Sequence, residues 1–300
     1  MNKLIFAMFK HSFILLVTSI VFLFTLKAEA QKSDEFNLDE TYAIAENGTI
    51  NLDSDDANVT ITGSDREDVR VVVNYRMRVR GLSFGNKEGF EMIVEEDNGN
   101  LNIFEKEREN STKVVVGSSR EEYEITIEAP RGVSLKLNGD DENYRISSID
   151  GSIGIDADDS DVELNECNGD AFSIKLDDGE LLMDGGNGSL ELELDDGDAR
   201  IFNGNFSDVH IDTDDGDVDL TTSLADGGNY RFSTDDGDLL LNIAGGGGEF
   251  VIRHDDTDIS TSSEFEETMS DDDLSIYTLP LGNAKINIET DDGNVVLRVI

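Results

Sequence analysis

The sequence predicts an all-β protein, and within that class a β-solenoid built from two-strand coils of about 19 residues. The first observation is an acidic tetrad, usually Asp-Asp-Gly-Asp, that recurs along the chain at nearly constant spacing. The second is an alternation of apolar and polar residues on both sides of each tetrad, which is the pattern of a strand with one buried face. The third is the presence of only two prolines, which suits long ladders of donating amides.

Residues 1–30 are predicted to be a signal peptide, so that the mature chain begins near Gln31. Lys3 and Lys10 supply a positive start, residues 14–24 supply an apolar middle, and an Ala-Glu-Ala cleavage site follows. An uncleaved anchor is the alternative, but the apolar run is short for a spanning helix. No later run is apolar enough to span a bilayer. The mature chain is therefore expected to be exported to the periplasm, the cell surface or the medium.

The chain is strongly acidic, and its charge is unevenly distributed. It has 67 acidic and 23 basic residues, and its net charge is −44. Such a chain is repelled by nucleic acid and anionic lipid, and it attracts cations and basic partners. Residues 31–133 form a predicted N-terminal β-rich region, and residues 134–300 form a predicted acidic solenoid region. Cys167 is the single cysteine, so no intramolecular disulfide can form.

The N-terminal region is predicted to contain longer strands than the acidic region. These strands are expected at residues 68–79, 90–96, 101–107, 113–117 and 123–130. Weaker tetrads begin at Asp55, Asp97 and Asp140, which are 42 and 43 residues apart, or about two coils each. The region is therefore expected to consist of coils with longer excursions.

The tetrads of the acidic region are spaced like the corners of successive coils. They begin at Asp140, Asp158, Asp177, Asp195, Asp214, Asp235 and Asp255, with intervals of 18, 19, 18, 19, 21 and 20 residues. Apolar residues occupy the fifth and third places before each tetrad and the first and third places after it, so all are expected to face one core. A second junction in each coil is rich in Gly and Asn, which adopt positive φ at little cost. A further tetrad begins at Asp291, and the gap of 36 residues before it is predicted to hold one degenerate copy.

An antiparallel β-meander or sandwich is the alternative architecture, because Asp-Gly also favours two-residue hairpin turns. The solenoid is favoured because stacking makes equivalent residues of successive coils neighbours and selects matching side chains there. Charge argues against stacking, since carboxylates about 5 Å apart repel each other by roughly 0.8 kcal/mol in water. A stacked column of tetrads would therefore need salt, raised pKa values or a bound cation.

Residues 123–164 (YEITIEAPRGVSLKLNGDDENYRISSIDGSIGIDADDSDVEL) and residues 50–73 (INLDSDDANVTITGSDREDVRVVV) carry a family resemblance. They resemble the bacterial putative-adhesin family of β-strand-repeat domains of unknown function, over about residues 40–300. The resemblance implies a right-handed β-helix, as in related autotransporter-adhesin-like domains, and an envelope or surface role without an established activity. The chain departs from the family at the first two tetrad positions, where Asp stands in place of Gly or Ser.

Calcium is the sharpest chemical hypothesis for the tetrads. Calcium takes about six to eight oxygen ligands, and three carboxylates in a tetrad could be joined by others from the next coil. The candidate ligands are Asp177, Asp178, Asp195, Asp196, Asp198, Asp214, Asp215, Asp217, Asp235, Asp236 and Asp238. The spacing matches neither an EF-hand nor a Gly-rich calcium roll. The alternative is that Asp side chains cap the turn and Gly takes the left-handed position.

Catalysis is not expected, because an active site would make one coil different and the tetrads are nearly equivalent. β-Helices do host polysaccharide hydrolases and lyases that use paired acids, but this chain has no tryptophan to stack on a sugar. His210 and His254 have no partner in register, so no zinc site is expected. Residues 265–273 (FEETMSDDD) are predicted to be a solvated excursion.

The sequence therefore predicts an exported, non-enzymatic envelope protein with an adhesin-like or scaffolding role. Its partner is an unidentified envelope or surface component, and the acidic tetrads are the candidate site for cations or a basic partner. An accessory protein of envelope stress or signalling is the alternative, and a polysaccharide-active enzyme is a third and less favoured reading of the same repeats.

Overall fold

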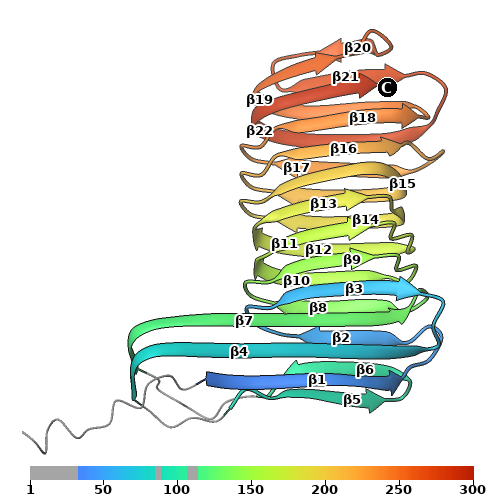
Figure 1. The fold of residues 1–300 in the computed structure, drawn as a ribbon. Coiled ribbons are helices and arrows are strands. Elements are labelled where there is room, and N and C mark those ends of the chain that lie inside the picture. Colours follow the sequence, from blue (N-terminus) through green and yellow to red (C-terminus); the bar gives the residue numbers. More distant parts are fainter. Residues whose placement is uncertain (1–32, 85–88, 107–113) are drawn as a thin grey trace, which may run out of the picture. The chain divides into compact units, whose positions relative to one another are not determined.

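The computed structural model describes residues 33–84, 89–106 and 114–300 and shows an all-β protein (Figure 1). These residues form 22 strands and no helix. The described part of the chain has no helical segment with the length and hydrophobicity of a membrane span. The predicted signal peptide lies outside the described residues.

The chain divides into two compact units. Among the described residues, unit 1 contains 33–35, 76–84, 89 and 114–121, and unit 2 contains the remainder. Three strands have residues in both units: β1 (Ser33–Ala43), β4 (Asp68–Phe84) and β7 (Val114–Pro130). The two strands predicted at residues 113–117 and 123–130 are thus parts of one strand, β7. Within unit 1, Arg76 of β4 forms an ion pair with Glu35 of β1.

Unit 2 consists of coils in which one strand precedes the tetrad and one follows it. We call these two sides face 1 and face 2. Face 1 contains β6 (Asn100–Glu105), β2 (Thr49–Asp53), β8 (Ser134–Gly139), β10 (Ile153–Asp159), β12 (Ala171–Asp178), β14 (Asn187–Leu194) and β17 (Asn229–Thr234). Face 2 contains β3 (Asn58–Ser64), β9 (Asn143–Ser147), β11 (Asp161–Asn165), β13 (Glu180–Asp184), β16 (Val218–Ser223) and β18 (Leu239–Gly245). The long strands β15 (Asp198–Thr213), β19 (Gly248–Thr261) and β22 (Ala284–Val299) contribute to both faces.

Successive coils pair in parallel, and equivalent residues of the repeat lie side by side. On face 1, Phe172 lies between Ile153 and Leu190. On face 2, Leu181 pairs with Val162 on one side and with Ala199 on the other. The solenoid-like architecture is confirmed by this register. The antiparallel meander or sandwich is wrong for these coils, because its neighbouring strands would run in opposite directions.

The alternating apolar residues form the core of unit 2, as predicted. From Leu135 to Leu297, the residues at the expected inward places are buried, and each large aliphatic side chain contributes about 1.5–3 kcal/mol by leaving water. The exceptions follow the tetrad at Asp255, where Ile259 is half-buried and Thr261 is exposed. This part of β19 pairs with β22, and no other described strand covers its second side.

The order of the stack departs from the order of the chain at both ends. β2 lies between β6 and β8, and β22 lies between β17 and β19. The coil at the C-terminal end of the chain is therefore inserted into the stack rather than added to its end. The predicted division at residue 133 remains a prediction, although β2 and β8 pair across it.

The gap before Asp291 holds an antiparallel cap, and the prediction of a degenerate coil there was wrong. β20 (Glu266–Ser270) pairs antiparallel with β21 (Leu274–Leu279), which pairs antiparallel with β19. The prediction rested on the length of the gap, about two coils, and length does not encode the direction of the neighbouring strands, which explains the error. The acidic side chains of residues 265–273 are exposed as predicted, whereas Phe265 packs edge-on against Phe250 at a ring distance of 5.2 Å.

The weak tetrad at Asp97 is a hairpin turn rather than a coil corner. It joins β5 (Met92–Asp97) to β6, and these two strands are antiparallel. Asn98 and Gly99 have φ values of 51° and 86°, which are the two positive values of a type I′ turn. The hairpin reading of the tetrad is therefore correct at this one copy.

Candidate functional site

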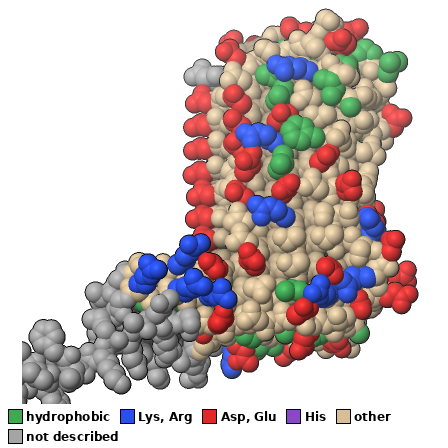
Figure 2. Space-filling model, viewed as in Figure 1, with side chains coloured by type: hydrophobic (Ala, Val, Ile, Leu, Met, Phe, Trp, Pro, Cys, Tyr) green, Lys and Arg blue, Asp and Glu red, His purple; other side chains and the backbone are tan. Residues whose placement is uncertain are grey.

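The first two tetrad positions of successive coils form a column that we call the aspartate edge (Asp140 to Asp236). Figure 2 shows acidic side chains following one edge of the stack. Backbone bonds hold the column in register, since the second Asp of one coil donates its amide to the carbonyl of the first Asp of the preceding coil. The N···O distance is 2.9 Å from Asp196 to Asp177 and 3.0 Å from Asp236 to Asp214.

Glycine at the third tetrad position is required by the closeness of the stacked backbones. A Cβ on Gly216 would lie 1.9 Å from the carbonyl oxygen of Gly197, and one on Gly237 would lie 2.1 Å from that of Gly216. These glycines do not have positive φ, so the expected left-handed turn is wrong for the central tetrads. Among the third-position glycines of the described tetrads, Gly99, Gly179 and Gly293 show it. Thr213 and Thr234 support the corner by accepting the amides of Gly216 and Gly237.

Aspartate at the fourth tetrad position joins one coil to the next. The Oδ1 atoms of Asp198, Asp217 and Asp238 accept the amides of the equivalent residues one coil further, at 3.1, 2.9 and 2.9 Å. Three of the eleven predicted calcium ligands therefore have a structural hydrogen bond. Sequence reasoning missed this role, although the recurrence of Asp at the fourth position was its signal.

The aspartate edge carries charge that is not neutralised by ion pairs within the described residues. Among the described residues, no lysine or arginine forms an ion pair with a first-position or second-position Asp between Asp140 and Asp236. Partial loss of solvent and, after it, the neighbouring carboxylates raise the pKa of Asp178 and of Asp235. The repulsion expected from the sequence is thus present along the stack.

The predicted calcium ligands do not form a chelating group in this structure. Within the described residues, no three His, Cys, Asp or Glu side chains are grouped as a metal site requires. The calcium hypothesis therefore rests on the charge of the aspartate edge, and it stays a prediction.

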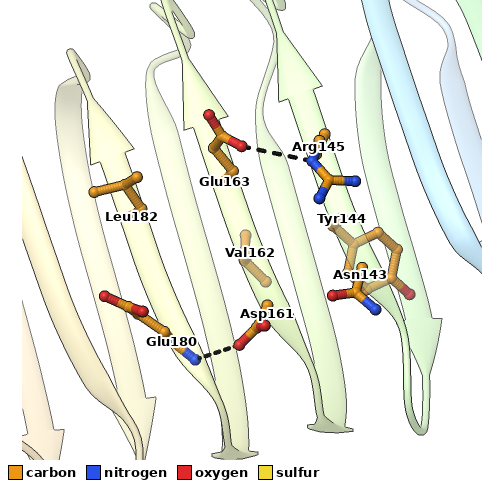
Figure 3. A pocket seen from close by; sticks show the side chains of 8 residues that line it. All are labelled: Asn143, Tyr144, Arg145, Asp161, Val162, Glu163, Glu180 and Leu182. Carbon is orange, nitrogen blue, oxygen red and sulfur yellow. Dashed lines mark hydrogen bonds and ion pairs between the residues drawn. The ribbon is translucent and has the colours of Figure 1, made fainter.

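A shallow trough of about 200 Å³ lies on face 2 (Figure 3). Its polar residues bind one another: Arg145 Nε lies 3.7 Å from Glu163 Oε2, and the amide of Glu180 donates to Asp161 Oδ1 at 3.1 Å. The side chain of Glu180 also accepts from Arg200. The hydrogen-bonding capacity of this trough is therefore largely used within the protein.

A larger trough of about 490 Å³, the face 1 trough, crosses β12, β14, β15, β17 and β22. Two columns of side chains form its walls, and the strand backbones between them form its floor. One wall consists of Ala171, Ser189, Asp208 and Asn229, and the other consists of Ser173, Glu191, His210, Arg231 and Asn287. The walls combine hydroxyl, amide, carboxylate, imidazole and guanidinium groups.

The histidines and the cysteine have structural surroundings. His210 is half-buried in the face 1 trough, and His254 Nε2 lies 3.0 Å from Ser275 Oγ. Cys167 is buried, its thiol lies 3.6 Å from the carbonyl oxygen of Asn165, and burial raises its pKa. A buried thiol with a raised pKa is a poor nucleophile.

Glu142 is a buried carboxyl group that sequence reasoning did not find. It occupies the third tetrad position, where later coils have Ser, Gly or Thr, and it is 1% exposed. Ser54 Oγ donates to its Oε1 at 3.1 Å, while its Oε2 has no hydrogen-bond partner among the described residues. Burial, opposed by this hydrogen bond and reinforced by Asp55 and Asp140, raises the pKa of Glu142 to about 8. The departure from Gly was the available signal.

Comparisons with known proteins give one family and several solved structures. A family model described as Toastrack DUF4097 matches residues 47–298. A "putative adhesin" from Parabacteroides distasonis is 12% identical with a TM-score of 0.44, and the match covers 89% of this chain and 98% of that one. A "putative adhesin" from Bacteroides fragilis is 12% identical with a TM-score of 0.34, and the match covers 88% and 97%. A "putative cell adhesion protein" from Clostridium sporogenes is 12% identical with a TM-score of 0.29, and the match covers 88% and 100%. No curated protein matches this chain.

Proposed function

Because this chain belongs to the Toastrack DUF4097 family of unknown function, we propose that it is a non-catalytic binding scaffold of the cell envelope. The observation that carries the proposal is the equivalence of the coils. Stacking places the same exposed positions of successive coils in columns, as Ser173, Glu191 and His210 are placed on face 1. A catalytic centre needs one coil to differ, whereas a binding surface can use every coil.

Three further proposals concern the localisation of the chain, the handedness of the coils and the charge of the aspartate edge. The mature chain is proposed to be exported and to have an adhesin-like role, because residues 1–30 have the organisation of a signal peptide. The coils are proposed to wind right-handed, since about 98% of parallel β crossovers have this hand. The aspartate edge is proposed to attract cations, because its carboxylates lack basic partners within the described residues.

Localisation and binding to cells test the proposal together. A C-terminally tagged chain is expressed in a bacterial host, the cells are fractionated, and the N-terminus of the purified protein is identified by mass spectrometry. We expect an envelope or secreted protein that begins near Gln31 and binds saturably to intact bacterial cells. Retention in the cytosol with residues 1–30 intact, or release of reducing ends from polysaccharides by the purified protein, would overturn the proposal.

A further inference from the structure

We propose that the face 1 trough binds a linear, uncharged polysaccharide that lies along the stack; this inference rests on the proposed scaffold function and names its ligand class. The trough has a volume of about 490 Å³, which lies within the range of about 300–1,000 Å³ of ligand sites. It crosses five neighbouring strands, so its length is about 19 Å at a strand spacing of about 4.8 Å.

Unused hydrogen-bonding groups distinguish this trough from the trough on face 2. Among the described residues, Glu191, Asp208 and Arg231 have no ion pair and no side-chain hydrogen bond, and His210 Nδ1 has no partner. One column further along the same strands, Lys175 and Glu193 pair at 2.6 Å. The trough on face 2 likewise satisfies its own groups through Arg145 and Glu163. The face 1 trough therefore presents donors and acceptors that remain available to a ligand.

The period and chemistry of the walls match an extended sugar chain. The strands β12, β14, β15 and β17 each add one residue to each wall, and β22 adds Asn287 to one of them. Each ring of an extended polysaccharide advances by a distance similar to the strand spacing. Carboxylates accept from sugar hydroxyls, while the guanidinium of Arg231 and the amides of Asn229 and Asn287 donate to them or to ring oxygens. Ala171 supplies the only apolar side chain of the walls, so the trough has no pocket for the apolar anchors of a peptide.

The mixed charge of the walls also selects the ligand. Glu191 and Asp208 would repel a polyanionic chain, and Arg231 would repel a polycation. A neutral polyhydroxylated chain uses both kinds of group. Because the walls contain no Phe, Tyr or Trp side chain for stacking, recognition depends on the hydrogen bonds, and single substitutions should have large relative effects.

Calorimetric titration of the full mature chain with hexamers of β-1,4-linked glucose and of β-1,4-linked N-acetylglucosamine, and with neutral dextran, tests the proposal. We expect at least one of these probes to bind saturably. Glu191→Ala and Arg231→Ala should each weaken that binding about tenfold, the effect of one lost hydrogen bond to a charged group. The matched face 2 variants Arg145→Ala and Glu163→Ala should change it less than twofold, and unchanged melting temperatures would show that all four variants are folded.

Three outcomes would overturn the proposal. They are the absence of binding to all three probes, equal losses in face 1 and face 2 variants, and tighter binding of a peptide library than of the sugars. The trough and the scaffold function can fail separately. If the chain binds intact cells and the Glu191→Ala and Arg231→Ala variants retain that binding, the trough is excluded as the binding site while the scaffold function stands.

Discussion

At the scale of single residues, the repeat is constrained most tightly by the third tetrad position. The backbone carbonyl of the preceding coil occupies the space that a Cβ would need at Gly216. Stacking, and not the turn conformation, therefore selects glycine in the central tetrads. A hairpin turn would instead select glycine for its positive φ. Close stacking and a hairpin turn therefore predict different effects of an alanine substitution.

Gly216→Ala is expected to destabilise the protein by about 1–3 kcal/mol, because the new methyl group forces two backbones apart. Gly154→Ala is the matched control, since its Cβ would meet nothing closer than 3.8 Å and its φ is not positive. This control should be neutral or slightly stabilising. Urea unfolding of both variants measures the difference, and equal effects would show that the coils are not in close contact at Gly216.

Glu142→Gln tests the buried carboxyl group. The pKa of Glu142 is about 8 in the folded chain, and its ordinary value is 4.5. Between these two pH values, Glu142 is therefore protonated in the folded chain and ionised in the unfolded chain. The contribution of Glu142 to the free energy of unfolding is therefore fully present below pH 4.5. It decreases as the pH rises to about 8, by about 5 kcal/mol at most.

The Gln variant should therefore match the wild type near pH 4 and exceed it in stability at pH 8. Chemical denaturation across this pH range provides the measurement. A variant whose stability follows the wild type in parallel at every pH would show that Glu142 is ionised in the folded protein.

At the scale of the coil, the aspartate at the fourth tetrad position stabilises the stack, whereas the aspartates at the first and second positions destabilise it. Asp217→Ala removes the acceptor of the Asp238 amide and should cost about 1 kcal/mol. Asp215→Ala removes one charge from the aspartate edge and should stabilise the coil by a few tenths of a kcal/mol. Thermal melting at low salt compares the two, and a change of the melting temperature in the same direction for both substitutions would contradict these opposite roles.

The strands and the core of each coil could be predicted from the sequence, whereas the ends of the stack could not. Alternation in a strand such as β12 specifies which side chains are buried, and the regular spacing of tetrads specifies which residues become neighbours. Alternation in β21 looks the same, although this strand is antiparallel to both β19 and β20. The insertion of β22 between β17 and β19 depends on contacts far apart in the chain, for which a local pattern has no signal.

The candidate sites were predicted less well than the coils, for a related reason. The tetrads were visible as acidic clusters, but the use of Asp198 as a structural acceptor depends on the coil that stacks on it. The face 1 trough is formed by residues from five strands, and none of its residues forms a motif within one strand. Glu142 broke the repeat visibly, yet its burial follows from the packing of Ser54 and the β8–β9 corner.

At the scale of the whole molecule, the aspartate edge makes stability depend on ions. Raising NaCl should raise the melting temperature, because salt screens the repulsion between carboxylates over about 10 Å at 0.1 M. At matched ionic strength, CaCl₂ should raise it further if divalent ions are taken up by the first two tetrad positions.

The triple variant Asp178→Asn, Asp196→Asn and Asp215→Asn should respond less to both salts. These substitutions remove charge from the second-position column and leave the fourth-position hydrogen bonds intact. Coincident melting curves for CaCl₂ and NaCl at matched ionic strength, together with no effect of a chelator, would exclude calcium at the predicted ligands.

The central claim is that the acidic tetrads are corners of coils stacked in parallel, which places equivalent residues of neighbouring coils side by side. Lys175 and Glu193 are such a pair, and strands about 4.8 Å apart allow a disulfide. Oxidation of Lys175→Cys with Glu193→Cys should therefore form an intramolecular disulfide in high yield, as detected by mass spectrometry. Lys175→Cys with Asp212→Cys, placed two strands apart, should not form one, and the single variants control for Cys167. Equal yields from the two pairs, or a disulfide in the second pair alone, would contradict the stacked coil.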